Sequence, residues 1–168
     1  MTIRRQLTMF KLALDCKLRA CDFVKLKVRD IAHGTTVQSR AILIQQKIGK
    51  PVQFEITTKT TNAITSWNKY QRLNTSDYLL PTRVKNNDHL STRQYSRIVK
   101  RWITSIGLDP TAYDTHSIRR TKVSLIYKRT KNLRAAQILL GHTKQESTVK
   151  YLGVAVDDAL EISEHTDI

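Results

Sequence analysis

The sequence has few acidic residues, few cysteines and no long apolar run. Of its 168 residues only 14 are Asp or Glu, against 29 Lys or Arg, so the formal net charge is +15. No apolar run approaches the ~18 residues that a membrane-spanning helix needs, and the basic N-terminus lacks the uninterrupted apolar stretch of a signal peptide. We therefore expect a soluble, cytoplasmic protein with no membrane partner.

The two cysteines, Cys16 and Cys21, do not predict a metal site. Five residues apart in a helical segment, they point to different sides of a helix, and no further cysteine completes a zinc site. We expect both to be reduced and structural. Nucleotide-binding and metalloprotease motifs of the GxxxxGK[ST] and HExxH kinds are absent as well, so no motif calls for a cofactor.

The excess of positive charge points to a polyanionic partner. A cationic surface gains free energy by releasing counterions from a phosphate backbone, which makes DNA or RNA the simplest partner. A ribosomal protein, or a basic protein that is merely well solvated, is the alternative reading of the charge. Charge alone says nothing about chemistry.

The apolar periodicity predicts a mostly helical α+β fold with a small antiparallel hairpin. Helical spacing before residue 31 predicts two helices with a break between them, and the segment from 39 to 57 predicts a β-hairpin with Lys47 at its tip. Helices are expected at 58–73, 93–108 (capped by Ser91 or Thr92), 116–129, 132–141 and 146–154, with Gly141 as a C-cap. The expected buried positions are Ile64, Trp67 and Tyr70 in one helix and Tyr95, Ile98, Trp102 and Ile106 in the next.

The C-terminal third holds a set of side chains suited to phosphate chemistry. "YDTHSIRRTKVS" (113–124) contains His116 and Arg119, and "LLGHTKQESTVKYLG" (139–153) contains His142 and Tyr151. A tyrosine hydroxyl, with a pKa of about 10, needs a base and a phosphate whose charge is masked before it can attack. Arginine masks that charge bidentately, and histidine transfers protons. Taken singly, each residue also fits a cap, a packing residue or a solvated basic face.

This arrangement resembles the tyrosine recombinase, or phage integrase, family. "HSIRRT" is similar to the family's His-x-x-Arg box, and in "LLGHTKQESTVKY" a Leu-Gly-His precedes the tyrosine by nine positions. "DCKLRACDFVKLKVRDI" resembles the first arginine box, with Arg19 as the arginine and Asp22 at the acidic position. "QQKIGKPVQFEIT" is similar to the lysine-bearing hairpin, and "DYLLP" to the stretch before the next helices. The resemblance spans residues 5 to 153.

The resemblance implies a catalytic role for each matched residue. Tyr151 would attack the scissile phosphate to form a 3′-phosphotyrosyl bond, while Arg19 and Arg119 clamp the non-bridging oxygens. Lys47 would protonate the leaving 5′ oxygen, His116 would be general base or proton shuttle, and His142 would donate to a phosphate oxygen. Asp22 would orient its neighbours, including Arg19. No cofactor, metal or ATP is required, because the phosphotyrosine stores the bond energy.

Three positions depart from the family pattern or stay open. Lys17 stands where the family usually has a glycine, which allows the local backbone to differ. Ile118 stands where leucine is usual, a volume-conserving change. Lys50 lies three residues after Lys47 on the same turn, so either can be the hairpin lysine, and Lys47 is preferred because it follows the first strand.

The expected organisation is a catalytic domain at 1–153 and a tail at 154–168, without the N-terminal DNA-binding domain usual in the family. The acidic tail is expected to dock on a neighbouring subunit, or else to fold back on its own domain. Partners are double-stranded DNA and further copies of the chain, a tetramer in synapsis and a monomer when free. The predicted DNA contacts are Lys50, Arg93, Arg97, Lys100, Arg101, Arg120 and Lys122.

The function implied is site-specific DNA recombination or integration for a phage or other mobile element. Bound to DNA, such an enzyme would lie in a prokaryotic nucleoid. A type IB topoisomerase that relaxes supercoils with much the same residues is one alternative. A non-catalytic DNA-binding module derived from an integrase is another, although every matched reactive position carries a reactive residue.

Overall fold

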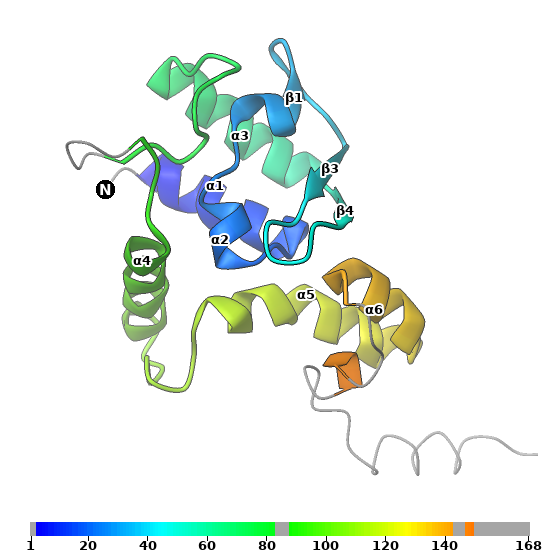
Figure 1. Ribbon diagram of the computed structural model, residues 1–168. Helices are drawn as coiled ribbons and strands as arrows, with labels where there is room; N and C mark the ends of the chain where they lie inside the picture. Colours follow the sequence, from blue (N-terminus) through cyan, green and yellow to red (C-terminus); the bar gives the residue numbers. More distant parts are fainter. Residues whose placement is uncertain (1–2, 83–87, 143–146, 150–168) are drawn as a thin grey trace, which may run out of the picture.

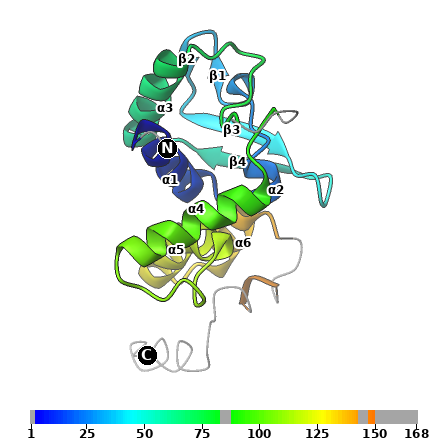
Figure 2. The same ribbon diagram turned by 90° about the vertical axis from the view of Figure 1, so that its left-hand side faces the viewer.

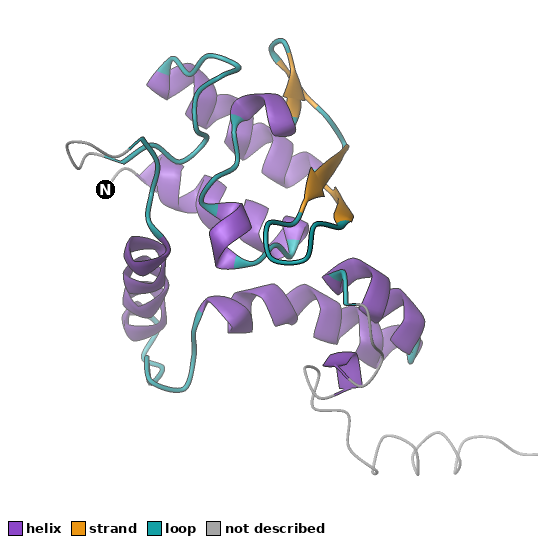
Figure 3. Ribbon diagram, viewed as in Figure 1, coloured by secondary structure: helices purple, strands orange, loops and turns teal. Residues whose placement is uncertain are grey.

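The chain adopts a mostly helical α+β fold with two short antiparallel hairpins (Figures 1 and 3). The computed structural model describes residues 3–82, 88–142 and 147–149. Its helices are α1 (Ile3–Cys16), α2 (Ala20–Phe23), the 3-10 helix η1 (Val28–Asp30), α3 (Thr58–Gln71), α4 (Thr92–Ser105), α5 (Thr115–Thr130) and α6 (Leu133–Leu140). Its strands are β1 (Ala32–His33), β2 (Thr36–Val37), β3 (Arg40–Ile44) and β4 (Pro51–Glu55). The fold class predicted from the sequence is confirmed.

The predicted break between the first two helices lies at residues 17–19. Helix α1 ends at Cys16, and Lys17 follows in the left-handed conformation with φ +52°. The second helix is shorter than the apolar spacing predicted. It is α2, which comprises four residues and ends before Leu26. Leu26 is buried, and its carbonyl accepts a hydrogen bond of 2.8 Å from the N–H of Leu79.

The predicted hairpin at 39–57 is confirmed as the pair β3–β4. The strands run antiparallel in a register that joins Arg40 to Glu55 and Ile44 to Pro51. Alternation on β4 buries Val52 and Phe54, as expected for a hairpin with one face on the core. The turn between the strands carries Lys47, and the smaller pair β1–β2 forms a separate two-stranded sheet.

The main core lies between α1, α2, the β3–β4 hairpin, α3 and α4. Ile64 and Trp67 on α3 are buried as predicted, and the Trp67 indole donates a 2.8 Å hydrogen bond to the Leu79 carbonyl. Burial of Tyr70 was predicted wrongly, because this ring is 50% exposed. It stacks on Trp67 from outside and is covered by the guanidinium of Arg4, 5.0 Å from its centroid.

Helix α4 begins at a capping box and presents one apolar face. The Ser91 hydroxyl accepts from the backbone N–H of Gln94, whose side chain accepts in return from the Ser91 N–H. Tyr95 and Ile98 are buried and Trp102 is half-buried. The expected burial of Ile106 is wrong: it lies just past the end of the helix and is 68% exposed.

Helices α5 and α6 lie beside one another below the hairpins in Figure 1, and Figure 2 shows α4 crossing in front of them. Val123 of α5 packs with Ala136 and Leu140 of α6 in a second, smaller core. Helix α6 also contacts β4, and it ends at Gly141 with φ +62°, which confirms the predicted C-cap. Among the described residues, no helix is long and apolar enough to cross a membrane.

Candidate active site

Arg119 joins the chain segment that carries Arg19 to the chain segment that carries His142. Its guanidinium is 3% exposed, with Nε donating to the Lys17 carbonyl and one terminal nitrogen donating to the Leu140 carbonyl, both at 2.6 Å. Lys17 lies two residues before Arg19, and Leu140 two residues before His142. Arg119 therefore fixes the segment after α1 and the end of α6 against α5.

Arg19 is held by a neutral partner. It lies at the N-terminus of α2, and its guanidinium donates to the side-chain oxygen of Gln45 at the end of β3. Gln45 is 1% exposed. An amide oxygen orients a guanidinium without neutralising it, so Arg19 keeps its charge toward a phosphate.

Asp22 connects α2 to the turn that carries Lys47. One carboxylate oxygen accepts a 3.0 Å hydrogen bond from the backbone N–H of Gln46, while the other is buried without a hydrogen-bond partner among the described residues. The sequence predicted that Asp22 orients its neighbours. In the structure the neighbour that it contacts is the backbone of this turn, where both Lys47 and Lys50 are exposed.

His142 lies close to both arginines. Its Nδ1 is 3.1 Å from the hydroxyl of buried Thr148, which belongs to the short helical segment 147–149. Burial, and then the positive charges of Arg119 and Arg19, lower the pKa of His142 from 6.5 to about 4. The imidazole is therefore neutral at pH 7, and the charges of both guanidinium groups contribute to the lowered pKa of His142.

Of the two remaining proposed residues, the structure describes His116 but not Tyr151. His116 is exposed in the first turn of α5, three residues before Arg119 and so on the same helical face. Its backbone N–H donates a 2.9 Å hydrogen bond to the N-cap carboxylate of Asp114. The predicted nucleophile Tyr151 lies outside the described residues, as do the tail at 154–168 and most of the helix predicted at 146–154.

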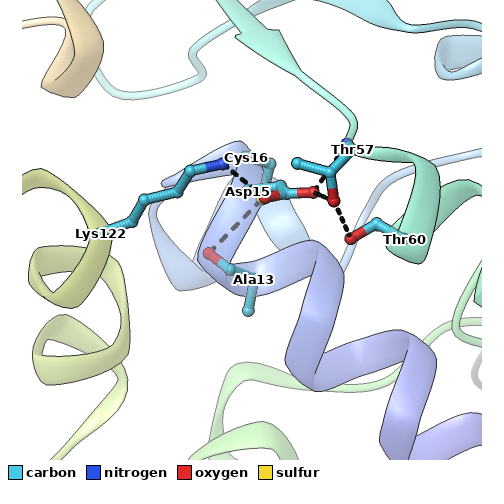
Figure 4. Close-up of polar contacts among 6 residues, drawn as sticks. All are labelled: Ala13, Asp15, Cys16, Thr57, Thr60 and Lys122. Carbon is cyan, nitrogen blue, oxygen red and sulfur yellow. Dashed lines mark hydrogen bonds and ion pairs between the residues drawn. The ribbon is translucent and has the colours of Figure 1, made fainter. Parts of the chain in front are cut away.

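A partly buried polar cluster joins α5, the end of α1 and the N-cap of α3 (Figure 4). The Lys122 ammonium lies 2.6 Å from the Asp15 carboxylate, which also accepts from the backbone N–H and the hydroxyl of Thr57. Burial alone would raise the pKa of Asp15, but the hydrogen bonds from Lys122, Thr60 and Thr57 hold it below its usual value. Lys122, predicted to contact DNA, is thus paired inside the chain.

Lys17 sits beside this cluster with an unusual backbone. Its φ of +52° lies in the left-handed region that favours glycine, the residue usual at this position in the family pattern. Lys17 is 3% exposed, and burial, followed by the like charge of Lys122, lowers its pKa. The conformation directs its carbonyl toward Arg119.

The other predicted DNA contacts are accessible. Lys50, Arg93, Arg97, Lys100, Arg101 and Arg120 all have exposed side chains. Within residues 3–82, 88–142 and 147–149, no three His, Cys, Asp or Glu side chains are grouped closely enough to hold a metal ion. DNA contact by the six exposed side chains stays a prediction.

Comparison with known proteins places the chain in a family. The sequence profile described as "Phage integrase family" matches residues 2–157. The chain belongs to the phage integrase family. "Probable integrase/recombinase YoeC" of Bacillus subtilis is 25% identical over 162 residues, covering 92% of this chain and 80% of YoeC. A "Tyrosine recombinase" of Pseudothermotoga lettingae is 28% identical over 156 residues, covering 90% of this chain and 50% of the relative.

The solved structure of a site-specific recombinase has the same fold. The XerH site-specific recombinase, bound to difH substrate in a pre-cleavage complex, superposes with a TM-score of 0.73 at 17% identity, over 99% of this chain and 49% of XerH. The chain thus spans about half the length of XerH and of the P. lettingae relative. The family resemblance drawn from the spaced boxes is confirmed.

Sequence reasoning missed Gln45 and the carbonyls that hold Arg119. Gln45 stands in "QQKIGK" two positions before Lys47, where an alternating strand pattern assigns it no special function. The Lys17 and Leu140 carbonyls are backbone groups, which carry no sequence signal. The positive φ of Lys17 could have been predicted indirectly, because the family pattern usually has glycine at this position.

Proposed function

We propose that this chain is the catalytic domain of a site-specific tyrosine recombinase, which cuts and rejoins double-stranded DNA through a 3′-phosphotyrosyl intermediate. The observation that carries the proposal is the grouping of Arg19, Arg119 and His142, held together by the two hydrogen bonds of Arg119 to the Lys17 and Leu140 carbonyls. Two guanidinium groups beside a neutral imidazole suit a phosphodiester, which carries one negative charge and several acceptor oxygens.

The two arginines would stabilise the charge of the transition state. Arg119 is fixed by two carbonyls and Arg19 by an amide, and all three of these acceptors are neutral oxygens. Preorganised cations in a partly buried site stabilise the additional charge on a pentacoordinate phosphorus more than mobile ones do. They would also mask the phosphate charge that otherwise repels a nucleophile.

His142 would donate a hydrogen bond to a non-bridging oxygen. In the tautomer in which Nδ1 accepts from the Thr148 hydroxyl, the neutral imidazole carries its proton on Nε2, from which it would donate to a phosphate. The phosphate in turn would stabilise the imidazolium form. His142 would therefore bind the substrate as a neutral donor and gain proton affinity once the phosphate is in place.

The covalent step needs a nucleophile, a base and an acid. The Tyr151 oxygen would form a bond to phosphorus while the bond to the 5′ oxygen breaks. His116 would accept the phenolic proton, directly or as a shuttle, and Lys47 would donate a proton to the leaving 5′ oxygen. Religation reverses these transfers with a 5′-hydroxyl from the same or a second duplex.

Assembly on DNA forms part of the proposal. The net charge of +15 and the exposed side chains of Arg93, Arg97, Lys100 and Arg101 on α4 suit phosphate contacts. Strand exchange between two duplexes requires several copies, with a tetramer as the proposed synaptic form and the acidic tail at 154–168 docking on a neighbour. A cytoplasmic site of action follows from a DNA substrate.

Strand exchange distinguishes a recombinase from a type IB topoisomerase. The chain would be incubated with two differently labelled duplexes taken from its native flanking DNA, and in parallel with supercoiled plasmid. A recombinase yields recombinant duplexes that join the two labels. Relaxation of the plasmid without recombinant product would contradict the proposal and favour the topoisomerase, and duplex binding without either product would favour a non-catalytic module.

A further inference from the structure

The side chain of Gln45 lies between two parts of the candidate site. It is 1% exposed although polar, and its backbone is fixed by a hydrogen bond from its N–H to the Lys50 carbonyl (2.9 Å) and one from the Gly49 N–H to its carbonyl (2.8 Å). These two bonds close the turn that carries Lys47. The side chain therefore extends from a rigid frame.

One end of the Gln45 amide binds Arg19, and the other lies against Gly141. The side-chain oxygen accepts from the Arg19 guanidinium. A Cβ added to Gly141 would lie 2.5 Å from Gln45 Nε2, so the amide packs directly on the backbone of the α6 C-cap. Gly141 immediately precedes His142, and thus the lysine turn, Arg19 and the histidine segment meet at one buried amide.

We propose that Gln45 is a positioning residue, which holds the Arg19 guanidinium against the His142 segment while leaving its positive charge available to the scissile phosphate. The inference rests on the proposed recombinase function. A buried arginine beside a carboxylate would be equally well ordered but electrically compensated. A methionine of similar size would fill the same space yet offer only a weakly accepting sulfur in place of the amide oxygen. The neutral acceptor combines order with an uncompensated charge.

The proposal is tested by Gln45→Met and Gln45→Glu, with Gln53→Met on the exposed face of β4 as the matched control. Proton–nitrogen NMR of the free protein at low temperature reports whether rotation of the Arg19 guanidinium is restricted, and Arg19→Lys assigns its signals. We expect restricted rotation in the wild type, Gln53→Met and Gln45→Glu, and averaged signals in Gln45→Met. Thermal melting of each variant verifies that it folds.

Cleavage provides the second measurement. On nicked duplexes, both Gln45 variants are expected to form the covalent adduct about tenfold to a hundredfold more slowly than wild type, while duplex affinity stays unchanged. Gln45→Glu should slow adduct formation without lowering the melting temperature. If Gln45 had a purely structural role, cleavage would slow only together with a loss of stability. Restricted Arg19 signals in Gln45→Met, or wild-type cleavage by either variant, would overturn the inference.

Failure of the inference differs visibly from failure of the proposed function. If the wild type forms no adduct, the recombinase proposal fails, and the spectra still decide whether Gln45 holds Arg19. If the wild type cleaves and the Arg19 signals are insensitive to Gln45→Met, the recombinase proposal stands and the positioning role is excluded.

Discussion

The carboxylate of Asp22 accepts a hydrogen bond from the backbone N–H of Gln46, 24 residues further along the chain. This contact ties the helix that begins after Arg19 to the turn that carries Lys47. The side chain of Gln45, next to Gln46, makes a second connection by accepting a hydrogen bond from Arg19. Arg19 and Lys47 are therefore positioned by the same pair of contacts between α2 and the hairpin turn.

Removing the Asp22 carboxylate should loosen the hairpin turn. Asp22→Ala is expected to lower the free energy of unfolding by about 1 to 3 kcal/mol, because a buried charge-assisted hydrogen bond is lost. Hydrogen exchange at the Gln46 amide should accelerate and cleavage should slow. Asp22→Asn keeps an acceptor oxygen and should retain most of the protection. An unchanged exchange rate at Gln46 in Asp22→Ala would show that the turn does not depend on Asp22.

Lys47 and Lys50 can be separated by the chemistry of the leaving group. Lys47→Ala should slow cleavage of an ordinary phosphodiester by about 10²- to 10⁴-fold, the usual contribution of a general acid. A substrate with sulfur at the bridging 5′ position should restore the rate, because a thiolate leaves without a proton. Lys50→Ala serves as the control and should cleave both substrates at the wild-type rate. Rescue of Lys50→Ala instead of Lys47→Ala would reverse the assignment.

His142 should titrate far below an ordinary histidine. Its pKa is lowered to about 4, first by burial and then by Arg119 and Arg19, so NMR should find a midpoint near that value in the free protein. The pKa of the unfolded side chain is 6.5, so between pH 6.5 and 4 the unfolded chain binds a proton that the folded protein does not. The contribution of His142 to stability is therefore complete above pH 6.5 and is lost as the pH falls toward 4. Arg19→Gln should raise the midpoint. An unshifted midpoint near 6.5 would mean that His142 is neither buried nor beside the two arginines.

The buried ammonium of Lys17 should destabilise the fold at neutral pH. Lys17→Met keeps the length of the side chain and removes the charge, so the free energy of unfolding should rise by on the order of 1 kcal/mol. The folded pKa of Lys17 lies below 10.5, lowered by burial and by Lys122, and the folded state therefore releases this proton first as the pH rises. The advantage of Lys17→Met should shrink as the pH approaches 10.5. A variant less stable than wild type at pH 7 would indicate that the charge is favourably paired.

The sequence predicted those parts of the molecule that depend on local pattern or on spaced boxes. The helix break before Arg19, the hairpin around Lys47 and the cap at Gly141 each have a local signature in apolar period or turn residues. Burial was predicted less well: Tyr70 and Ile106 have the correct period but are 50% and 68% exposed. Periodicity identifies a face and cannot tell how far the packing extends along it.

The contacts that assemble the site were not predictable in the same way. Arg119 binds two carbonyls 102 and 21 residues away, and these backbone groups are alike in every sequence. Gln45 and Asp15 are polar residues whose burial depends on partners brought together only by the tertiary fold. The family resemblance predicted reactive roles for Arg119 and His142, whereas the structure identifies what holds them.

The proposed function requires that Tyr151 becomes covalently attached to DNA within this site. The direct measurement is to incubate the protein at low salt with nicked suicide duplexes from its native flanking DNA, and to resolve the products on a denaturing gel beside Tyr151→Phe. We expect a protein–DNA adduct in the wild type that is absent from Tyr151→Phe, with equal duplex binding by both proteins. An adduct that persists in Tyr151→Phe, or duplex binding without any adduct in the wild type, would contradict it.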